Sequence, residues 1–182
     1  ELRKVSYLQT PQEVLAVFEL PDSNASSAIE FPKDKLSLAL DGVQNPGNLG
    51  TIIRIADWFG IENIYCSQDT ADAYNPKVVQ ATMGSIARVN IIYTDITKLL
   101  TSLPADYPVY GTLLDGEDIY AKELSKQGII VMGNEGNGIS QEVRKHVNNR
   151  LLIPNFATAA DKAESLNVAI ATAITCSEFR RR

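Results

Sequence analysis

The chain is poor in the residues that build metal centres and covalent cross-links. Its 182 residues include one histidine, His146, and two cysteines, Cys66 and Cys176. The cysteines lack the C-x-x-C spacing of zinc or redox sites, and a lone histidine supports no metal centre. The sequence therefore predicts neither a metal site nor a disulfide framework, and it fits a reducing, cytoplasmic location.

Long apolar runs and an excess of positive charge are also missing. No apolar stretch approaches the length of a membrane span, so we expect no membrane partner. The formal net charge is −5. Because nucleic-acid-binding surfaces are usually basic, this acidity argues against RNA or DNA binding unless positive charge is gathered on one face. The residues available for such a face are Arg54, Lys77, Arg88, Lys162 and Arg180–Arg182.

What the chain does have is a regular alternation of strand and helix patterns. Apolar runs such as LSLAL and GIIVM are typical of parallel strands that are covered on both faces. We expect strands at 36–40, 62–66, 88–92, 108–113, 129–132 and 150–154. We expect helices at 51–59, 75–83, 95–102, 119–125, 140–147 and 166–179. This order predicts an α/β fold with a doubly wound, mostly parallel sheet and helices on both faces.

The first 34 residues differ from the rest. Thr10-Pro11-Gln12-Glu13 is a capping box with proline at the first helical position, and it predicts a short helix at 12–18. Residues 22–34 are rich in Ser, Asn and Asp, as in a linker. Because the chain begins with Glu1 rather than methionine, we expect a fragment whose main domain is 35–182.

Polar residues concentrate in three loops that each follow a strand and precede a helix, at 41–50, 133–138 and 155–167. In α/β proteins such loops bind ligands. All three contain Asn or Ser, and the second adds Glu135. This constellation is the strongest functional clue in the sequence.

The first loop offers two interpretations. Asn48 fits a helix N-cap, and Arg54 lies in the first turn of a helix expected from Thr51. Helix side chains lean toward the amino end, so the guanidinium is expected to reach back over the loop. The alternative is a solvated arginine that pairs with Asp57 or lies on Trp58.

The second and third loops leave alternatives of the same kind. Loop 133–138 is neither G-x-G-x-x-G nor a P-loop, and the carboxylate of Glu135 would repel a phosphate. Glu135 suits an arginine partner or a cationic or hydroxyl-bearing ligand, or it favours the dipole of the following helix. Ser165 either joins the site or caps the last helix. Residues 168–174 are apolar nearly all round, which predicts burial and a homodimer.

Three motifs, taken together, resemble those of the SpoU–TrmH family of RNA ribose methyltransferases, within the SPOUT superfamily. They are LDGVQNPGNLGTIIRIADWFG, IIVMGNEGNGIS, and LLIP followed by ESLNVAIATAI. The stretches NPKVVQATMGSIARV and VYGTLLDGEDIY are also similar to the family. TPQEVLAVFELP resembles the end of a small substrate-binding domain. The resemblance implies that residues 1–34 are a remnant of that domain plus a linker, and that 35–182 form the catalytic domain.

The resemblance also implies a deep C-terminal trefoil knot, S-adenosylmethionine bound in that knot without a metal, and a homodimer. The polar residues that match the family's catalytic set are Asn48, Arg54, Glu135, Ser165 and Asn167. Cofactor contacts are implied at Leu113, Gly133, Ile153 and Leu166. The Cβ-free backbone of Gly133 is expected to let the ligand approach. Two departures are a long third loop, 155–163, without the family's common glycine, and Gln80 where many relatives have arginine.

The reaction implied is transfer of the sulfonium methyl group to a ribose 2′-hydroxyl in tRNA or rRNA, which leaves S-adenosylhomocysteine. A guanidinium is nearly always protonated, so we expect Arg54 to grip the target nucleotide, held by Asn48 and Glu135, rather than to act as the base. Ser165 and Asn167 would orient the loops. Two alternatives are a catalytically silent RNA-binding or scaffold protein of the same fold, and a NAD-type dehydrogenase, against which the missing glycine fingerprint argues.

Overall fold

The computed structural model describes residues 34–158 and 163–181, together with residues 4–6, 14, 16, 17 and 19. In this part of the chain six strands form one sheet in the order β3-β2-β1-β5-β4-β6, and every neighbouring pair is parallel. The strands are β1 Leu36–Asp41, β2 Asn63–Cys66, β3 Asn90–Tyr93, β4 Val109–Asp118, β5 Gly128–Gly133 and β6 Asn149–Leu152. The predicted parallel α/β sheet is confirmed.

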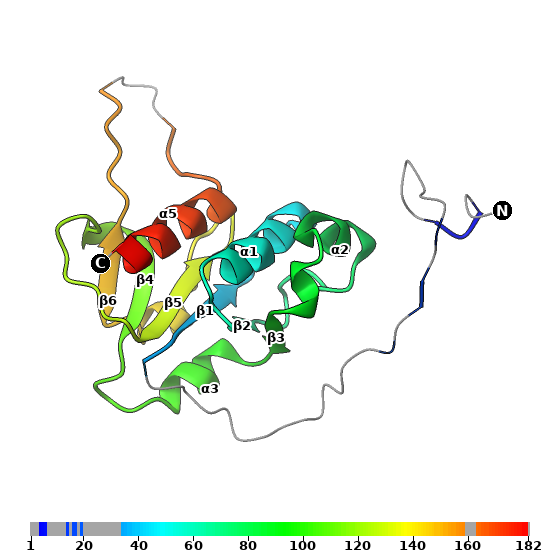
Figure 1. The fold of residues 1–182 in the computed structure, drawn as a ribbon. Coiled ribbons are helices and arrows are strands. Elements are labelled where there is room, and N and C mark those ends of the chain that lie inside the picture. The colour runs from blue at the N-terminus through cyan, green and yellow to red at the C-terminus, as the bar shows by residue number, and fades with distance from the viewer. Residues whose placement is uncertain are drawn as a thin grey trace.

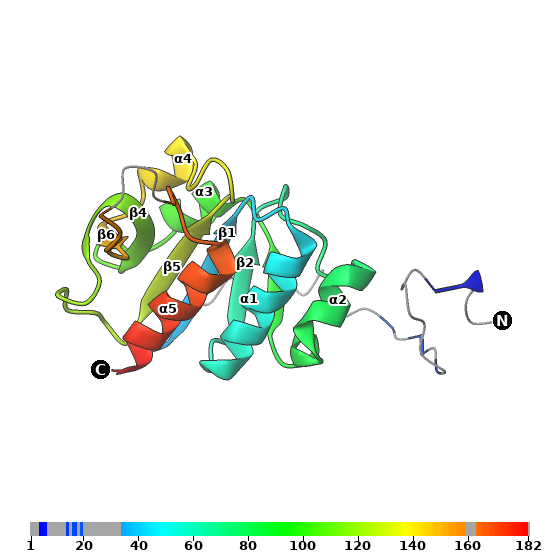
Figure 2. The same cartoon turned by 90° about the horizontal axis from the view of Figure 1, so that it is seen from above.

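Helices cover both faces of the sheet, as predicted. They are α1 Pro46–Trp58, α2 Pro76–Thr82, α3 Ile96–Thr101, α4 Gln141–Arg144 and α5 Val168–Arg181, with a 3-10 turn η2 at Ser85–Ala87. Figures 1 and 2 show α1, α2 and α5 on one face and α3 and α4 on the other. None of the described helices is long and apolar enough to cross a membrane.

The two faces of the sheet contribute to two separate hydrophobic cores. In β1, Leu38 and Leu40 belong to the core under α1 and α5, whereas Ala39 between them belongs to the core under α3 and α4. Ile130 and Val131 of β5 divide in the same way. Side chains of a strand alternate between faces, so covering both faces requires the continuous apolar runs seen in the sequence.

Helix α1 begins earlier than the sequence predicted. The side-chain oxygen of Asn45 accepts hydrogen bonds from the N–H groups of Gly47 and Asn48, at 2.9 and 3.1 Å, and Pro46 occupies the first helical position. An N-cap side chain and a proline at this position together satisfy the needs of a helix start. The predicted cap at Asn48 is therefore wrong, because Asn48 already lies in the first turn.

Close packing between α1 and α2 explains why a glycine occurs inside α1. A Cβ on Gly50 would lie 2.7 Å from the carbonyl oxygen of Val78 in α2. A larger residue would push the two helices apart, so the glycine that looks like a loop residue is required by a helix contact. The loop of the first motif is accordingly shorter than predicted and ends at Asn45.

Helices α1 and α5 run side by side in the same direction and are tied at both ends (Figures 1 and 2). At the amino ends, Asn167 Nδ2 donates a hydrogen bond to Asn48 Oδ1 at 2.9 Å. At the carboxyl ends, the Arg180 guanidinium donates to the carbonyl oxygens of Phe59 and Gly60, at 2.8 and 3.1 Å. A cation there also complements the negative end of the α1 dipole.

The helix predicted at 119–125 is wrong. Strand β4 instead continues to Asp118, and both Thr112 and Glu117 pair with Leu151 of β6, so residues 113–116 loop out of the strand. Gly116 permits this close crossing, because a Cβ there would lie 2.7 Å from the backbone nitrogen of Leu151. The backbone N–H groups of residues 121 and 122 bond to the Asp118 carbonyl, which forms a single turn and not a helix.

Other predictions lie outside these observations. The helix at 12–18 and the domain remnant at 1–34 fall almost wholly outside the described residues, and both stay predictions. The trefoil knot also stays a prediction, because strand order alone does not define how the chain is threaded.

Candidate functional site

One amide side chain connects the three loops. Asn48 Nδ2 donates to Glu135 Oε1 at 2.9 Å, and Asn48 Oδ1 accepts from Asn167 Nδ2 at 2.9 Å. Asn48 lies in the first turn of α1, just after the loop that follows β1, whereas Glu135 and Asn167 lie in the loops that follow β5 and β6. The structure therefore brings together three of the five predicted catalytic residues at the carboxyl edge of the sheet, where parallel α/β proteins place their sites.

Glu135 binds the backbone of the first loop as well as Asn48. Its two carboxylate oxygens accept hydrogen bonds from the N–H groups of Gln44 and Asn45, at 3.2 and 3.1 Å. Partial burial works to raise the pKa of this carboxyl. Hydrogen bonds from Asn48 and from the backbone N–H groups of Glu135 itself, Asn45 and Gln44 outweigh burial and lower the pKa below its usual value. The charged carboxylate thus ties loop 133–138 to loop 41–45.

The second loop is a tight turn that packs on its own base. Asn134 and Gly138 exchange two backbone hydrogen bonds of 2.9 Å, and Asn134 Nδ2 donates to the Gly42 carbonyl at 2.7 Å. A Cβ on Gly133 would collide with the backbone of Gly138 and Ile139. The structure therefore gives a different reason for the glycine than the predicted one: its own loop fills the space beside Gly133.

Asn167 has a second role, which the sequence assigned to Ser165. The Asn167 side-chain oxygen accepts from the N–H groups of Ala169 and Ile170, at 2.9 and 3.3 Å, so Asn167 caps α5. The alternative that Ser165 is the cap is wrong. Ser165 is exposed and forms no hydrogen bond with a described residue, so it stands outside the Asn48 network.

Arg54 also lies apart from this network. Because α1 begins at Pro46, Arg54 is in its third turn, about 9 Å along the helix axis from Asn48. The side chain is exposed and forms no hydrogen bond or ion pair with the described residues. Contrary to the sequence prediction, Arg54 is not held by Asn48 and Glu135, which face each other and the loop backbone instead.

The surface alternative for Arg54 is confirmed in part, because its side chain is exposed, but the pairing with Asp57 is wrong. Asp57 accepts hydrogen bonds from Arg88 Nη2 and Ser85 Oγ, each at 2.7 Å. The bonds from Arg88 and Ser85 lower the pKa of the Asp57 carboxyl below its usual value. Trp58, four residues after Arg54, is 83% exposed. The outward side of α1 thus presents an arginine and a tryptophan to the surroundings.

A cavity of about 480 Å³ lies beside the segment that loops out of β4. Its lining residues are Thr112, Leu113, Leu114, Asp115, Asn137, Gly138, Ile139, Gln141 and Arg144. Its volume lies within the range of about 300–1,000 Å³ that is usual for small-molecule sites. Of the four predicted cofactor residues only Leu113 lines it. Gly133 is buried under its loop, Ile153 is half-buried, and Leu166 is 50% exposed.

The described arms of the third loop stand away from the body of the molecule in Figure 1. Its described arms, 153–158 and 163–167, are joined by a 3.1 Å hydrogen bond from Asn155 Nδ2 to the Ala163 carbonyl. Phe156 on this loop is 83% exposed. The described arms of this long loop therefore project from the molecule and are held to each other by this hydrogen bond.

Cysteine and metal chemistry find little support in the part of the chain that the structure describes. Burial raises the pKa of both the Cys66 and Cys176 thiols to about 12. No group of three or more His, Cys, Asp or Glu side chains in the described segments is placed to hold a metal ion.

Sequence reasoning missed two residues that shape the site. Asn45 caps α1, and Asn134 fastens the second loop to the first. The Asn-Pro pair at 45–46 was an available signal, because asparagine followed by proline is a common helix start. Asn134 carried no such signal, since its partner is the Gly42 carbonyl, 92 residues away in sequence.

Polar loops that converge at the carboxyl edge of a wholly parallel sheet, beside a cavity, define a ligand-binding α/β protein whose site is assembled from distant motifs. Residues 35–177 match the profile of the SpoU rRNA Methylase family. The chain therefore belongs to the SpoU rRNA methylase family, and the resemblance seen in its three motifs is confirmed.

Named relatives support this placement. The chain is 33% identical over 178 residues to the 23S rRNA (guanosine(2553)-2′-O)-methyltransferase RlmP of Bacillus subtilis, a match that covers 97% of this chain and 68% of the relative. A TrmH-family structure from Porphyromonas gingivalis matches with a TM-score of 0.88 and 45% identity, over 100% of this chain and 71% of the other. An AdoMet-bound rRNA methyltransferase from Sinorhizobium meliloti matches with a TM-score of 0.75 and 35% identity, over 84% of this chain and 58% of the other.

Proposed function

We propose that this chain is the catalytic part of an S-adenosylmethionine-dependent RNA methyltransferase that modifies a ribose 2′-hydroxyl in rRNA or tRNA. The observation that carries the proposal is the network of Asn48, Glu135 and Asn167, which joins the three motifs of the family at one place. The Bacillus subtilis relative is named as a 23S rRNA 2′-O-methyltransferase, and the Sinorhizobium meliloti structure contains AdoMet. Membership of this family removes the dehydrogenase alternative.

The residues around the cavity fit S-adenosylmethionine. Leu113, Leu114 and Ile139 offer apolar surface for an adenine ring, and the neighbouring Asn137 and Gln141 offer donors and acceptors for polar edges. We assign Leu113 to direct contact with the cofactor, and Gly133, Ile153 and Leu166 to the loops around it. When bound, the cofactor supplies a methyl group on a sulfonium, which is activated toward attack by an oxygen nucleophile.

The protein's own contribution is to place the nucleotide. Hydrogen bonds among Asn48, Glu135 and Asn167 hold the three loops in one arrangement, which lowers the entropic cost of aligning a 2′-hydroxyl with a methyl group. Arg54 has no partner among the described residues, so its guanidinium is available for a nucleotide phosphate or hydroxyl. As a protonated group it donates hydrogen bonds, so the proton of the 2′-hydroxyl leaves to a different acceptor.

A homodimer is part of the proposal. The sequence predicted that helix α5 is buried nearly all round, and this prediction is wrong. The helix is buried on the side that faces α1 and the sheet. Ile170 on α5 is 53% exposed, and Trp58 on α1 is 83% exposed. The two parallel helices thus expose Ile170, Trp58 and Arg54, and a second subunit placed there would lie against the residue assigned to the target nucleotide. The cytoplasm, where unassembled rRNA and tRNA occur, is the proposed location.

Two measurements test the function. Calorimetric titration with S-adenosylmethionine and with NAD should show binding of the first alone. Ribose-methylation mapping by mass spectrometry, in cells with and without the gene, should show one position that loses its methyl group. Binding of RNA and cofactor with an unchanged methylation map would favour the catalytically silent alternative.

A further inference from the structure

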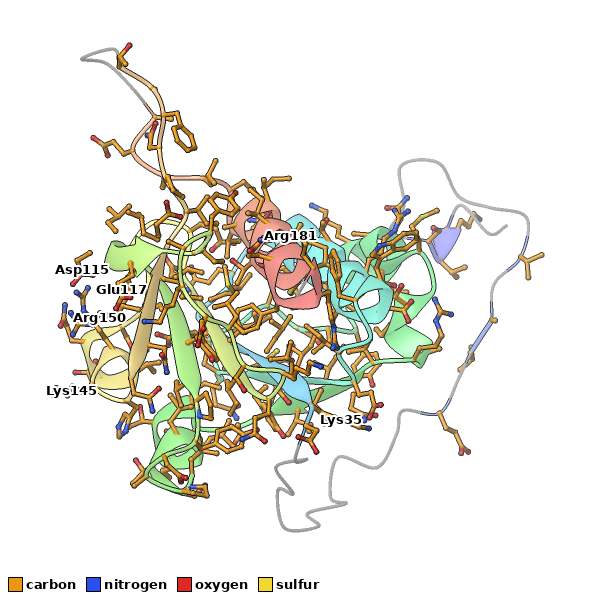
Figure 3. The ribbon with its side chains drawn as sticks, turned by 60° about the vertical axis from the view of Figure 1, so that its left-hand side comes forward. Lys35, Asp115, Glu117, Lys145, Arg150 and Arg181 are labelled. Atoms are coloured by element: carbon orange, nitrogen blue, oxygen red, sulfur yellow. The ribbon has the colours of Figure 1, made fainter. Side chains whose placement is uncertain are left out.

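An ion-pair cluster holds residues 113–116, which form one wall of the cavity. Asp115 Oδ2 accepts hydrogen bonds from Arg144 Nη2 of α4 at 2.5 Å and from Arg150 Nη1 of β6 at 2.9 Å. Figure 3 shows Asp115 and Arg150 together at the β6 edge of the molecule. One carboxylate oxygen therefore links three elements: the looped-out part of β4, α4 and β6.

The looped-out residues 113–116 are held both by these ion pairs and by Leu113, which packs against the core under α3 and α4. Leu114 is 80% exposed, so apolar packing holds it weakly. Gly116 fixes one end of the segment against the Leu151 backbone. Among the described residues, Asp115 makes all the side-chain hydrogen bonds of this segment. The two arginines therefore add to the packing of Leu113 in holding this side of the cavity.

The three charged residues differ in their relation to the cavity. Asp115 and Arg144 line it, but Arg150 does not. Asp115 has 46% of its side chain exposed and Arg150 has 49%, so each pair is partly screened by water. Two donors on one carboxylate form a network rather than an isolated surface pair, and such networks fix geometry more firmly than single pairs do.

We propose that Asp115 is a positioning residue that sets the affinity of this cavity for the cofactor, by locking the wall 113–116 against α4 and β6. The proposal rests on the proposed function, in which the cavity takes S-adenosylmethionine. The side chain acts through the backbone of the wall and through Leu113. The cluster of Asp115, Arg144 and Arg150 is called the lock below. Arg150 belongs to it although it does not line the cavity.

The test compares Asp115→Asn and Arg150→Gln with a matched control. Glu117→Gln removes the same kind of charge two residues away, where Glu117 pairs with Lys122 at 3.0 Å outside the cavity lining. The probe is S-adenosylhomocysteine, titrated by calorimetry into each variant of the 182-residue chain. Asp115→Asn should weaken its affinity about threefold to tenfold, the amount that two partly exposed ion pairs supply. Arg150→Gln should weaken it in the same direction, and Glu117→Gln should leave it unchanged.

Three further readouts separate a lock from a general loss of structure. The double variant Asp115→Asn/Arg150→Gln should bind no more weakly than Asp115→Asn alone, because both changes open the same lock. Arg150→Lys, which keeps one charged donor, should recover part of the affinity. For Arg150→Gln the KM for the cofactor should rise while kcat at saturating cofactor stays near the wild-type value.

The outcomes decide between distinct failures. No binding of S-adenosylhomocysteine to the wild-type chain would overturn the proposed function itself. Wild-type binding with an unaffected Asp115→Asn, an equal loss in Glu117→Gln, or a clearly additive double variant would overturn the lock alone. A greater loss for S-adenosylmethionine than for its neutral product would also overturn it, since that result would indicate a charge effect instead of a positional one. Should Asp115→Asn fail to fold, Arg150→Gln and Arg150→Lys answer the same question.

Discussion

Arg54 is the residue that the proposed function assigns to the target nucleotide, and it has no hydrogen-bond or ion-pair partner among the described residues. Arg54→Ala should lower methyl transfer to RNA by about 10²- to 10³-fold, a loss typical of removing one donor that stabilises a reacting group. Cofactor affinity should be unchanged, since Arg54 does not line the cavity. The assay is transfer of a labelled methyl group to RNA from a strain that lacks the enzyme.

Two variants sharpen this assay. Lys98→Ala removes an exposed cation from α3, on the other face of the sheet, and should leave transfer intact. Arg54→Lys keeps the charge but loses the planar fork, so poor rescue would indicate bidentate recognition. Near-normal transfer by Arg54→Ala would end the assignment of Arg54 to the target nucleotide.

Glu135 makes the site sensitive to pH. Its folded pKa is lower than that of the unfolded chain, so its contribution to stability is fully present above the unfolded value, about 4.3, and is lost as the pH falls through the folded value. At pH 7 the wild type should therefore be more stable than Glu135→Gln, and the difference should shrink as the pH falls below the unfolded value and disappear below the folded pKa. Urea denaturation at several pH values measures this. A difference that is constant with pH would show that the charge of Glu135 does not tie the loops.

Residue identities at the site were largely predictable, but their partners were not. The motifs identified Asn48, Glu135 and Asn167 as site residues, and hydrogen bonds connect all three in the structure. The partners of Arg54 were wrong because they were inferred from a helix assumed to begin at Thr51, and the Asn45 cap moves Arg54 two turns away from the loop. A local shift in helix start is small in sequence but large in space.

At the scale of elements, the turn 133–138 gives a sharp contrast between two glycines. Gly133→Ala should destabilise the chain by about 1–3 kcal/mol, as overpacking does, because its Cβ meets the Gly138 backbone. Gly136→Ala should be tolerated, because its Cβ would meet only the Asn134 side-chain oxygen, at 3.5 Å. Denaturant unfolding compares the two. Equal stability of the two variants would mean that the turn yields to fit a Cβ, and that the packing at Gly133 is loose.

The elements that the sequence predicted well are those defined by local patterns. Apolar runs identified the core of each strand, since burial on both faces of a parallel sheet leaves a continuous signal. The errors arose where a distant segment decides the outcome. A glycine stands at position 50 inside α1 because α2 packs too closely there to leave room for a Cβ. Strand β4 continues past Thr112 because both Thr112 and Glu117 pair with Leu151 of β6. Neither contact has a trace in the local sequence.

At the scale of the whole molecule, the outer side of α1 and α5, where Trp58 and Ile170 are exposed, is the proposed subunit contact. Ile170→Lys should convert the proposed dimer to a monomer at micromolar concentration, because it replaces an exposed apolar side chain of that contact with a charge. Val79→Lys alters an exposed valine on α2, away from α5, and should leave the dimer intact. Light scattering gives the mass of each. A wild-type monomer, or a dimer in both variants, would move the subunit contact to a different surface.

The double pairing of Leu151 has a consequence for the order in which the chain folds. Thr112 and Glu117 precede Leu151 by more than thirty positions, so the wall between them gains its shape only after β6 has reached the sheet. Closing a loop of that length costs entropy before any contact compensates for it, so such a contact belongs late on the folding path. On a ribosome, the sheet from β1 to β5 is synthesised before the proposed cofactor cavity acquires its wall. We therefore expect this cavity to be among the last features of the domain to form, and the nascent protein to gain affinity for its cofactor only when β6 has reached the sheet.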